Sequence, residues 1–443
     1  MTTTIAATDG PLPPPSLRPV LRRPAAMMVV ALVLRLAAMT LGHTYRGNPN
    51  DDHFGFGWET GRIARSIAEG DGFSSPFHGR TGPTAWVAPI YPYVVAGVFK
   101  VFGVFTYSSA WVLLALNSLF SALTCWSIYA IARETVGLRI ARWAGWTWAL
   151  LPYSMYWAIR WVWETSFSAL LLSLAFLMAL RVSKSARLRD WALFGGVWGV
   201  IALANPSILS VMPFMLAWAC YQLYRERKRW LAPVSTAILV TVICVAPWMV
   251  RNYRTFGQVV FIRSNFGAEL RMGNSMSANG LWMDWLHPAH NDQEMAKYQQ
   301  MGELNYVHQR QSEALEFITE HPGRFAWLVF RRAAFFWSDT PRAWRYDIVF
   351  IFSRNGLFLL SSVLAFWGLW LVVRDRRRGA FLYAALMLVY PVVYYITFPH
   401  PRYRHPIEPE MLILGLYVLA QAMPPKNAYA GVEAGDSPAH LLA

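Results

Sequence analysis

The sequence predicts an all-α protein that crosses a membrane about ten times. Of its 443 residues, 55% are hydrophobic and only 15% are charged, whereas soluble domains carry about a quarter charged residues. Apolar runs long enough to cross about 30 Å of hydrocarbon recur along the chain. The net charge of +15 comes from arginines clustered in short segments between these runs. Such clusters are typical of cytoplasmic loops rather than of a nucleic-acid-binding surface.

Ten apolar runs are the predicted spans. The first follows a polar, proline-rich segment with no clear small-residue cleavage site, so an uncleaved span after a disordered cytoplasmic segment is expected. The run at 191–204 is short, and Asn205 and Pro206 predict a break at its end. The spans are 25–43, 108–132, 142–158, 164–182, 191–204, 207–224, 231–249, 350–373, 380–397 and 407–423.

A further apolar stretch, 87–104, is predicted to lie along the outer face of the membrane. It contains Pro89, Pro92 and Lys100, and counting it as a span would place four basic clusters outside, against the positive-inside rule. The predicted divisions are a cytoplasmic N-terminus (1–24), a transmembrane core (25–250) with a first outer loop (44–107), a periplasmic helical segment (251–349), C-terminal transmembrane helices (350–423) and a cytoplasmic tail (424–443).

The cysteines give no sign of a disulfide framework or of a thiolate metal site. There are three of them, Cys125, Cys220 and Cys244, and each lies within an apolar run. Their spacings match no metal-ligand pattern. Redox and zinc–thiolate chemistry are therefore not among the functions that the sequence supports.

The first outer loop concentrates charged residues beside the membrane, which is costly unless they meet a polar substrate there. Asp51 and Asp52 precede a predicted helix, 58–69, on which Glu59 and Arg62 share one face because they lie three residues apart. Glu59 is predicted to be a general base, Asp52 is the competing candidate, and its neighbour Asp51 is also a catalytic candidate. The alternatives are a surface ion pair for Glu59 and Arg62, and solvated or metal-binding aspartates.

Arginines on the outer side predict an anionic ligand. The planar guanidinium fork matches phosphate oxygens, and an Asn- and Gly-containing segment after Pro247 offers backbone N–H groups to an anion. The alternative is that each arginine pairs with a nearby carboxylate or with bulk phospholipid. The residues predicted to bind a donor phosphate are Arg62, Arg251, Arg263, Arg402, Arg404 and His405.

Four more side chains are predicted to contact a substrate. Tyr91 belongs to a proline-bounded segment that would floor a groove on the membrane. Glu164 opens a span, where Arg160 could instead neutralise it, and Arg35, inside the first span, is expected to face protein or to snorkel. The four predicted substrate-binding residues are Tyr91, Glu164, Asn265 and Asn274.

Taken together, these residues resemble a bacterial membrane glycosyltransferase of the GT-C type, in the group of the protein O-mannosyltransferases (glycosyltransferase family 39) and the aminoarabinose transferase of lipid A. The resemblance implies a GT-C fold with interfacial helices in the first outer loop and an active site on the outer face of the bacterial inner (plasma) membrane. It also implies a polyprenyl-phosphate-linked sugar donor and inversion by a loop carboxylate. The matching segments are 59–65, 70–73, Pro89 with Pro92, 102–103, Glu164, 247–252, 263–265 and 402–406.

The sequence departs from the family pattern at two places. Related transferases usually place an Asp-Glu pair shortly before the helix, where Phe56 and Gly57 stand here. They also often have a lysine before the double proline, where the chain reads 86–89 as Trp-Val-Ala-Pro. The first departure leaves the base open between Glu59 and Asp52. Because of the second departure, other cations would have to bind the phosphate. Whether a divalent metal is bound is also left open, and no metal ligands are assigned.

The implied partners are the lipid-linked donor, membrane lipids and an acceptor that is a lipid, a polymer or a protein, with no nucleic acid. A transporter or flippase of a lipid-linked or anionic solute is the alternative function. Transporters tend to show repeated halves and broken helices near the midplane, and the sequence offers only Arg35 and the pair Asn205-Pro206 in that respect. A non-catalytic scaffold in envelope assembly is a third hypothesis. The sugar, hexosyl or pentosyl, is left open.

Overall fold

The computed structural model describes residues 23–46, 56–340 and 348–423. Over these ranges the chain is helical and forms no β-strand, and only one isolated bridge pairs Ser74 with Pro83. The predicted all-α class is therefore confirmed.

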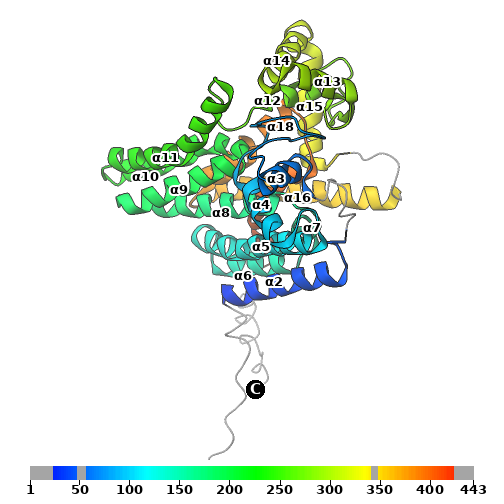
Figure 1. Ribbon diagram of the computed structural model, residues 1–443. Coiled ribbons are helices and arrows are strands. Elements are labelled where there is room, and N and C mark those ends of the chain that lie inside the picture. Colours follow the sequence, from blue (N-terminus) through cyan, green and yellow to red (C-terminus); the bar gives the residue numbers. More distant parts are fainter. Residues whose placement is uncertain (1–22, 47–55, 341–347, 424–443) are drawn as a thin grey trace, which may run out of the picture.

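The apolar helices form one bundle (Figure 1). They are α2 (Pro24–Leu41), α5 (Tyr107–Thr135), α6 (Leu138–Leu150), α7 (Pro152–Arg160), α8 (Thr165–Val182), α9 (Leu188–Ala204), η2 (Pro206–Val211), α10 (Met212–Arg225), α11 (Leu231–Phe256), α16 (Ile348–Arg374), α17 (Ala380–Leu388), α18 (Val392–Ile396), η4 (His405–Ile407) and α20 (Glu408–Ala422).

Several of these helices are long and apolar enough to cross a membrane. Within the described ranges there are six such segments, so the chain is a multi-pass membrane protein. They are Pro24–Leu41, Tyr107–Thr135, Thr165–Val182, Pro206–Arg225, Leu231–Phe256 and Asn355–Arg374. The number ten stays a prediction.

Prolines explain why two of the other predicted spans, 142–158 and 380–397, are each built from two shorter helices. Pro152 separates α6 from α7, and Pro391 precedes α18, because proline has no N–H for the helical ladder. The break predicted after 191–204 is confirmed, since α9 ends at Ala204 and a 3₁₀ helix follows.

Further helices connect the bundle helices, and those of the 251–349 segment gather at the top of Figure 1. The sequence predicts one long helix over about 292–320, but Gly302, with φ 74°, divides it into α13 and α14. The sequence also predicts an amphipathic helix over 323–338, which is confirmed as α15. The bounds are α3 (Glu59–Glu69), α4 (Ile90–Phe102), α12 (Phe266–Gly273), η3 (Asp284–Leu286), α13 (Asp292–Met301), α14 (Glu303–Glu320), α15 (Pro322–Ser338) and α19 (Pro401–Arg404).

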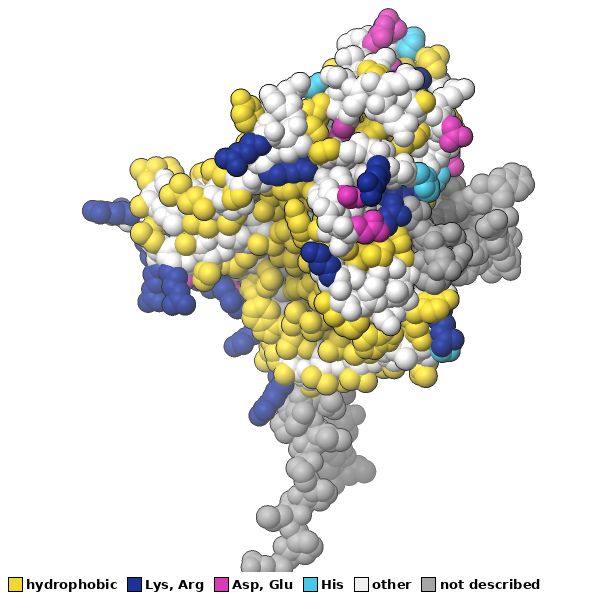
Figure 2. Space-filling model, viewed as in Figure 1, with side chains coloured by type: hydrophobic (Ala, Val, Ile, Leu, Met, Phe, Trp, Pro, Cys, Tyr) yellow, Lys and Arg dark blue, Asp and Glu magenta, His cyan; other side chains and the backbone are white. Residues whose placement is uncertain are grey.

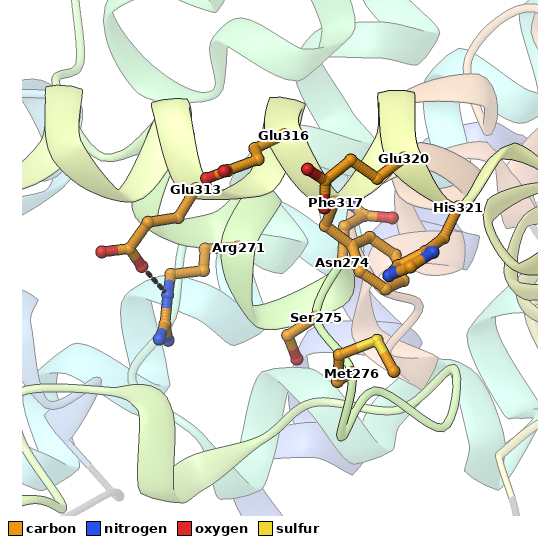
Figure 3. Close-up of a pocket in the computed structure, with 9 residues that line it drawn as sticks. All are labelled: Arg271, Asn274, Ser275, Met276, Glu313, Glu316, Phe317, Glu320 and His321. Carbon is orange, nitrogen blue, oxygen red and sulfur yellow. Dashed lines mark hydrogen bonds and ion pairs between the residues drawn. The ribbon is translucent and has the colours of Figure 1, made fainter.

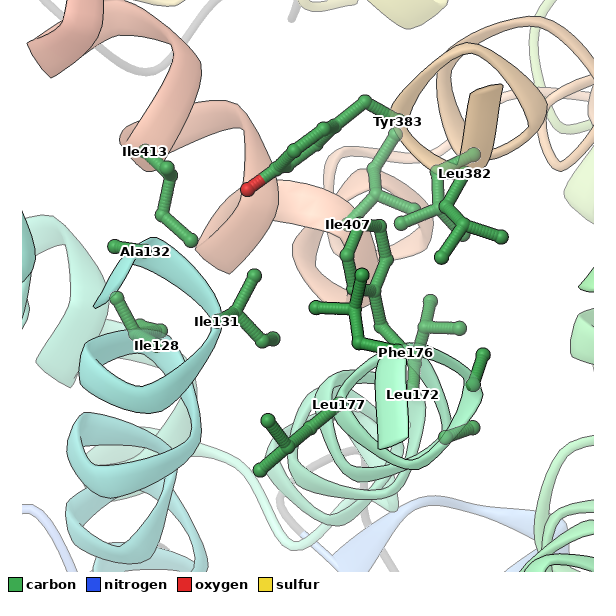
Figure 4. Close-up of a cluster of buried hydrophobic side chains, with 14 of the residues drawn as sticks. Ile128, Ile131, Ala132, Leu172, Phe176, Leu177, Leu382, Tyr383, Ile407 and Ile413 are labelled. Atoms are coloured by element: carbon green, nitrogen blue, oxygen red, sulfur yellow. The ribbon is translucent and has the colours of Figure 1, made fainter. Parts of the chain in front are cut away.

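Buried aliphatic and aromatic side chains hold the bundle together. Figure 4 shows side chains from α5, α8, α17, η4 and α20, among them Phe176 and Tyr383, gathered in one cluster. The rings of Phe176 and Tyr383 lie 4.8 Å apart. Because lipid tails are as apolar as these side chains, close packing rather than escape from water stabilises the bundle.

Arg35 of α2 faces protein, which is one of its two predicted placements, and is fully buried. Its guanidinium donates to the carbonyl oxygens of Trp148 (3.0 Å) and Ala149 (3.2 Å) and to the hydroxyl of Ser121 (3.0 Å). Those two carbonyls end α6, where Pro152 leaves them without helical partners. Arg35 therefore completes the hydrogen bonding of an interrupted helix.

The surface separates charge from apolar area. Figure 2 shows hydrophobic side chains over much of the bundle, with Lys and Arg side chains at the left-hand end of α9 to α11. Acidic and histidine side chains lie in the upper part, over α12–α15 and α3. A broad apolar surface with charge at its margins suits a lipid environment, in which unpaired charge is expensive.

Two glycines, Gly195 and Gly199, allow α9 and α11 to pack closely, because a Cβ atom on either would overlap an atom of α11. A Cβ atom on Gly195 would overlap the carbonyl oxygen of Ala237, whereas one on Gly196 would meet nothing within 4 Å. We expect Gly195→Ala to destabilise the protein by about 1–3 kcal/mol through overpacking and Gly196→Ala to leave stability equal or slightly higher. Thermal unfolding of both variants in detergent tests this, and equal effects would contradict the packing argument.

Candidate active site

α3 presents Glu59 from a tightly held turn. Gly57 (φ 75°) and Trp58 (φ 42°) both adopt left-handed backbone values immediately before the helix. A Cβ on Gly57 would lie 2.8 Å from the ring of Trp163 and 2.8 Å from the carbonyl oxygen of Val162, so the turn packs against the connection between α7 and α8. The predicted helix is confirmed, and Glu59 is its first residue.

Glu59 is held by a histidine from the 251–349 segment. The Nε2 atom of His287 lies 3.2 Å from Oε1 of Glu59, and the two side chains are only 6% and 19% exposed. Burial by itself raises the pKa of Glu59, but the hydrogen bond from His287 and the charge of Arg62 oppose it, and the pKa lies below its usual value. Glu59 is therefore a carboxylate at neutral pH.

Arg402 lies in the turn before the last helix of the bundle. The ring nitrogen Nδ1 of His400 accepts the backbone N–H of Arg402 and caps α19. The Arg402 guanidinium lies 4.1 Å from the ring centroid of Trp163 and donates to the Tyr403 hydroxyl (3.3 Å). Among the contacts of the described chain, its buried Nε atom has no hydrogen-bond partner. The arginine is thus oriented by aromatic rings and retains donor capacity.

The segment entering α12 adds a second carboxylate and a second cation. Arg263 Nε donates to Oδ1 of Asn265 (3.1 Å), and Asn265 Nδ2 donates to Oε1 of Glu269 (2.8 Å). Arg263 Nη2 lies 3.7 Å from the same Glu269 oxygen. Burial raises the pKa of Glu269 despite the positive charge of Arg263. The environments of Glu59 and Glu269 therefore push their pKa values in opposite directions.

These segments converge, since their charges act on one another. The charge of Glu59 acts on Arg402 and on Glu269, and Arg402 also interacts with Glu164 at the start of α8. Glu303 of α14 reinforces the assembly, because it accepts hydrogen bonds from the Ala85 backbone (2.7 Å) and from the Ser264 hydroxyl (2.7 Å). The loop 44–107, the α12 segment and the turn that carries Arg402 therefore form one half-buried site of alternating charge.

Comparisons with known proteins agree with this architecture. Residues 86–250 match the family model for dolichyl-phosphate-mannose-protein mannosyltransferase. The archaeal oligosaccharyltransferase AglB from Archaeoglobus fulgidus, solved with an inhibitory peptide and a dolichol-phosphate, superposes over 96% of this chain at 13% identity and a TM-score of 0.52. The apo form of the A. fulgidus enzyme covers 90% at 12% identity, also with a TM-score of 0.52. The chain has the GT-C fold.

The chain is shorter than these archaeal enzymes, since the alignments span 53% and 50% of their lengths. ArnT from Cupriavidus metallidurans, bound to undecaprenyl phosphate, is another structural match, at 14% identity and a TM-score of 0.39 over 89% of this chain and 77% of that protein. No curated protein sequence gave a significant match.

Arg404 and His405 were predicted to bind phosphate, but their contacts favour a structural role in the GT-C bundle. Arg404 is 2% exposed and donates to Glu408 (3.1 Å), to Ser362 (2.9 Å) and to the Phe358 carbonyl (3.1 Å). His405 is fully buried and lies 2.7 Å from the other oxygen of Glu408. Phosphate could reach these groups only by breaking a buried network.

Removing Arg404 should therefore cost stability rather than chemistry. Arg404→Ala leaves the buried Glu408 carboxylate without its guanidinium partner, and breaking such a pair typically costs about 3–5 kcal/mol. We expect a clearly lower melting temperature, with transfer activity per folded molecule near that of the wild type. Activity lost at full stability would return Arg404 to the list of phosphate ligands.

Arg251 was also predicted to bind phosphate, and its contacts likewise lie within the protein. It donates to the backbone carbonyls of Thr84 (2.7 Å) and Phe73 (2.8 Å), and its guanidinium lies 4.9 Å from the Trp248 ring centroid. These bonds fasten the first outer loop to the end of α11. A direct role in phosphate binding would require exchanging them.

Arg62 stays near Glu59, as its spacing predicts. It is 4% exposed, and one guanidinium nitrogen lies 3.0 Å from Nε2 of His78. Its charge lowers the pKa of Glu59. Arg62 therefore belongs to the site, where it acts on the carboxylate, and its phosphate-binding role stays a prediction.

The predicted substrate ligands divide between the site and the scaffold. Asn265 and Glu164 lie in the site, as described above. Tyr91 is 3% exposed and donates to Asn117 Oδ1 (2.9 Å). Asn274 is 1% exposed and donates to the Ile396 carbonyl (2.8 Å), which joins α12 to the end of α18. These contacts favour packing roles for Tyr91 and Asn274.

Asp51 and Asp52 lie outside the described residues, so their candidacy as bases stays a prediction. In the described chain, no group of three or more His, Cys, Asp or Glu side chains is arranged to hold a metal ion. The question of a divalent metal therefore rests on experiment.

A cavity of about 220 Å³ lies between α12 and α14, apart from this site. Figure 3 shows Arg271 paired with Glu313 at one end and His321 near the other. Glu269 and Arg271 are two residues apart on α12 and so face different sides of the helix. The cavity is lined by Arg271, Asn274, Ser275, Met276, Glu313, Glu316, Phe317, Glu320 and His321.

Sequence reasoning missed Glu269 and His287. A local signal existed for Glu269, because it follows Asn265 by four residues and so shares its helix face. No local signal marks His287, since its partner lies in the first outer loop. Only the tertiary fold brings that histidine to Glu59.

Proposed function

We propose that this chain transfers a sugar from a polyprenyl-phosphate-linked donor to an acceptor hydroxyl at the outer face of a bacterial plasma membrane, with inversion. The observation that carries the proposal is the convergence of a carboxylate, Glu59, with Arg402 and Arg263 in one half-buried site on a membrane-spanning bundle. An isoprenoid phosphate has an anionic phosphate group and a tail that lies in the membrane. The arginines of the site match the phosphate, and the membrane-spanning bundle matches the tail.

The chemistry is a single displacement. Glu59 takes the proton of the acceptor hydroxyl while the hydroxyl oxygen forms a bond to the anomeric carbon. The bond between that carbon and the phosphate oxygen breaks, and its electron pair leaves with the polyprenyl phosphate. Arg402 and Arg263 stabilise the negative charge that develops on this leaving group. One displacement at carbon inverts the anomeric configuration.

The pKa values support Glu59 as the base. Two carboxyl groups whose environments drive their pKa values apart often mark the acid and base roles of a site. Here the pKa of Glu59 is lowered and that of Glu269 is raised. Glu59 is the group that is ionised and ready to accept a proton, whereas Glu269 accepts a hydrogen bond from Asn265 and pairs with Arg263.

The comparisons support the class of donor. The matching family model describes mannosyl transfer from dolichyl phosphate, and AglB of the same fold was solved with a dolichol-phosphate. Dolichol and bacterial polyprenols present the same recognition elements, a phosphate on a long isoprenoid tail. The proposal extends to hexosyl and pentosyl donors and to lipid, polymer or protein acceptors.

The deciding experiment uses purified protein with a panel of radiolabelled polyprenyl-phosphate sugars and candidate acceptors. Transfer predicts release of polyprenyl phosphate and a labelled product whose anomeric configuration, measured by NMR, is inverted. Movement of intact donor across the bilayer of proteoliposomes, without cleavage, would instead identify a flippase and contradict the proposal. A product with retained configuration would contradict the single displacement.

A further inference from the structure

His287 occupies a buried and closely packed position beside the proposed base. It follows η3 and is 5% exposed. Its ring stands edge-on to the rings of Phe77, at 5.4 Å, and Trp86, at 5.9 Å. These two residues belong to the first outer loop, so the histidine is inserted into the loop that carries Glu59. The ring orientation is therefore fixed by packing before any substrate binds.

The hydrogen bonds of His287 determine its tautomer. Nδ1 accepts the backbone N–H of Ala289 at 3.2 Å. A backbone N–H is only a donor, so Nδ1 carries a lone pair and the ring proton resides on Nε2. Nε2 is the atom that faces Glu59, at 3.2 Å. A neutral imidazole thus satisfies both contacts, whereas a doubly protonated ring would direct an N–H at the N–H of Ala289.

We propose that His287 is a positioning residue for Glu59, donating its Nε2–H to the carboxylate as a neutral imidazole. This fixes the rotation of the carboxylate and leaves its other lone pairs for the acceptor hydroxyl. The inference rests on the proposed function, because it assigns His287 a role only through the base.

The effect on pH dependence follows from this hydrogen bond. A donor that favours the ionised form lowers the pKa of a carboxyl group, so removing it raises the pKa of Glu59 and shifts the acid limb of activity upward. The other titratable groups that face the pair are Arg62 on α3, Glu269 on α12, Asp284 and His290 beside η3, and Arg402 on α19. Replacing neutral His287 by a neutral residue leaves these charges in place.

The test compares three neutral replacements in the purified full-length protein. Glutamine can place its amide N–H near the position of Nε2, asparagine is too short to do so, and phenylalanine keeps the ring volume without a donor. In His287→Phe and His287→Asn we expect kcat to fall about 10–100-fold. The acid limb of kcat/KM should move up by about 1–2 pH units, the equivalent of one hydrogen bond to a charged group. His287→Gln should restore the limb nearly to its wild-type position, with the donor KM unchanged in all three.

Three results would overturn the inference. The first is an acid limb that stays at the wild-type pH in His287→Asn and His287→Phe, which indicates a purely structural histidine. The second is a His287→Gln variant no better than His287→Asn, a comparison that holds even if the phenylalanine variant does not fold. The third is a Glu59→Gln enzyme as active as the wild type, which removes the base that His287 would position. If the wild-type protein cleaves no donor, the proposed function itself is contradicted. That result is obtained before any variant is made, so the two failures can be told apart.

Discussion

Replacing Glu59 by glutamine should lower kcat for sugar transfer by about 10²–10⁴-fold, the usual contribution of a general base. Glutamine keeps the size of the side chain and can still accept the hydrogen bond from Nε2 of His287, which lies 3.2 Å from Glu59. The turn and helix should therefore fold as before, and the donor KM should change little. Initial rates with a radiolabelled polyprenyl-phosphate sugar, measured alongside thermal unfolding, provide the test.

The matched control is Glu69→Gln, at the other end of the same helix. Glu69 is exposed on α3, and replacing it by glutamine removes one negative charge from the helix, as Glu59→Gln does. The Glu69→Gln variant should therefore retain wild-type rates. Asp52→Asn completes the set, since Asp52 was the competing base. If Glu59→Gln keeps its activity while Asp52→Asn loses it, the base is Asp52 and the role of Glu59 is electrostatic.

The pH profile gives a further view of the same carboxylate. A base must be deprotonated to act, so activity rises with pH as Glu59 loses its proton and is lost as pH falls through its pKa. Because His287 and Arg62 lower the pKa of Glu59, the acid limb of kcat/KM should lie below the usual carboxyl value of about 4.3. An acid limb well above that value would indicate that a different group limits the rate.

Local patterns in the sequence predicted local structure well. The 3.6-residue periodicity and the glycine stop predicted α3 almost to the residue, and Gly70 ends it with φ 98°. The amphipathic pattern likewise predicted α15. The cost of a charge in lipid predicted that Arg35 either faces protein or snorkels, and it faces protein. In each case the deciding interactions lie within a few residues or follow from burial alone.

Pairings across the chain could not be predicted in this way. Arg402 and Arg404 look alike in the sequence, yet the short helix turns them toward different surroundings. Arg404 meets Glu408 one turn further on, a spacing of four that the sequence does contain. The position of Arg402 over Trp163, and that of His287 beside Glu59, depend on how distant segments pack. Such contacts become visible only in the folded chain.

Replacing Arg402 by alanine should reduce transfer by about 10²–10³-fold, which is the usual cost of removing one preorganised donor from developing negative charge. Its Nε atom has no hydrogen-bond partner among the described residues, and its charge acts on Glu59 and Glu164. The contacts with Tyr403 and with those carboxylates outweigh burial and raise its pKa, so the side chain remains a cation. A phosphate leaving group would use both the charge and the unused donor.

Arg402→Lys separates the two contributions, because lysine keeps the charge but lacks the planar fork. We expect it to recover part of the lost rate. Arg80→Ala is the control for charge alone, since Arg80 also lies in an outer segment but its side chain is 87% exposed. Its variant should transfer at the wild-type rate, because an exposed charge is screened by solvent. Should Arg402→Ala instead unfold at a much lower temperature and keep its rate per folded molecule, Arg402 would be a structural residue like Arg404, and the leaving group would have to be stabilised elsewhere.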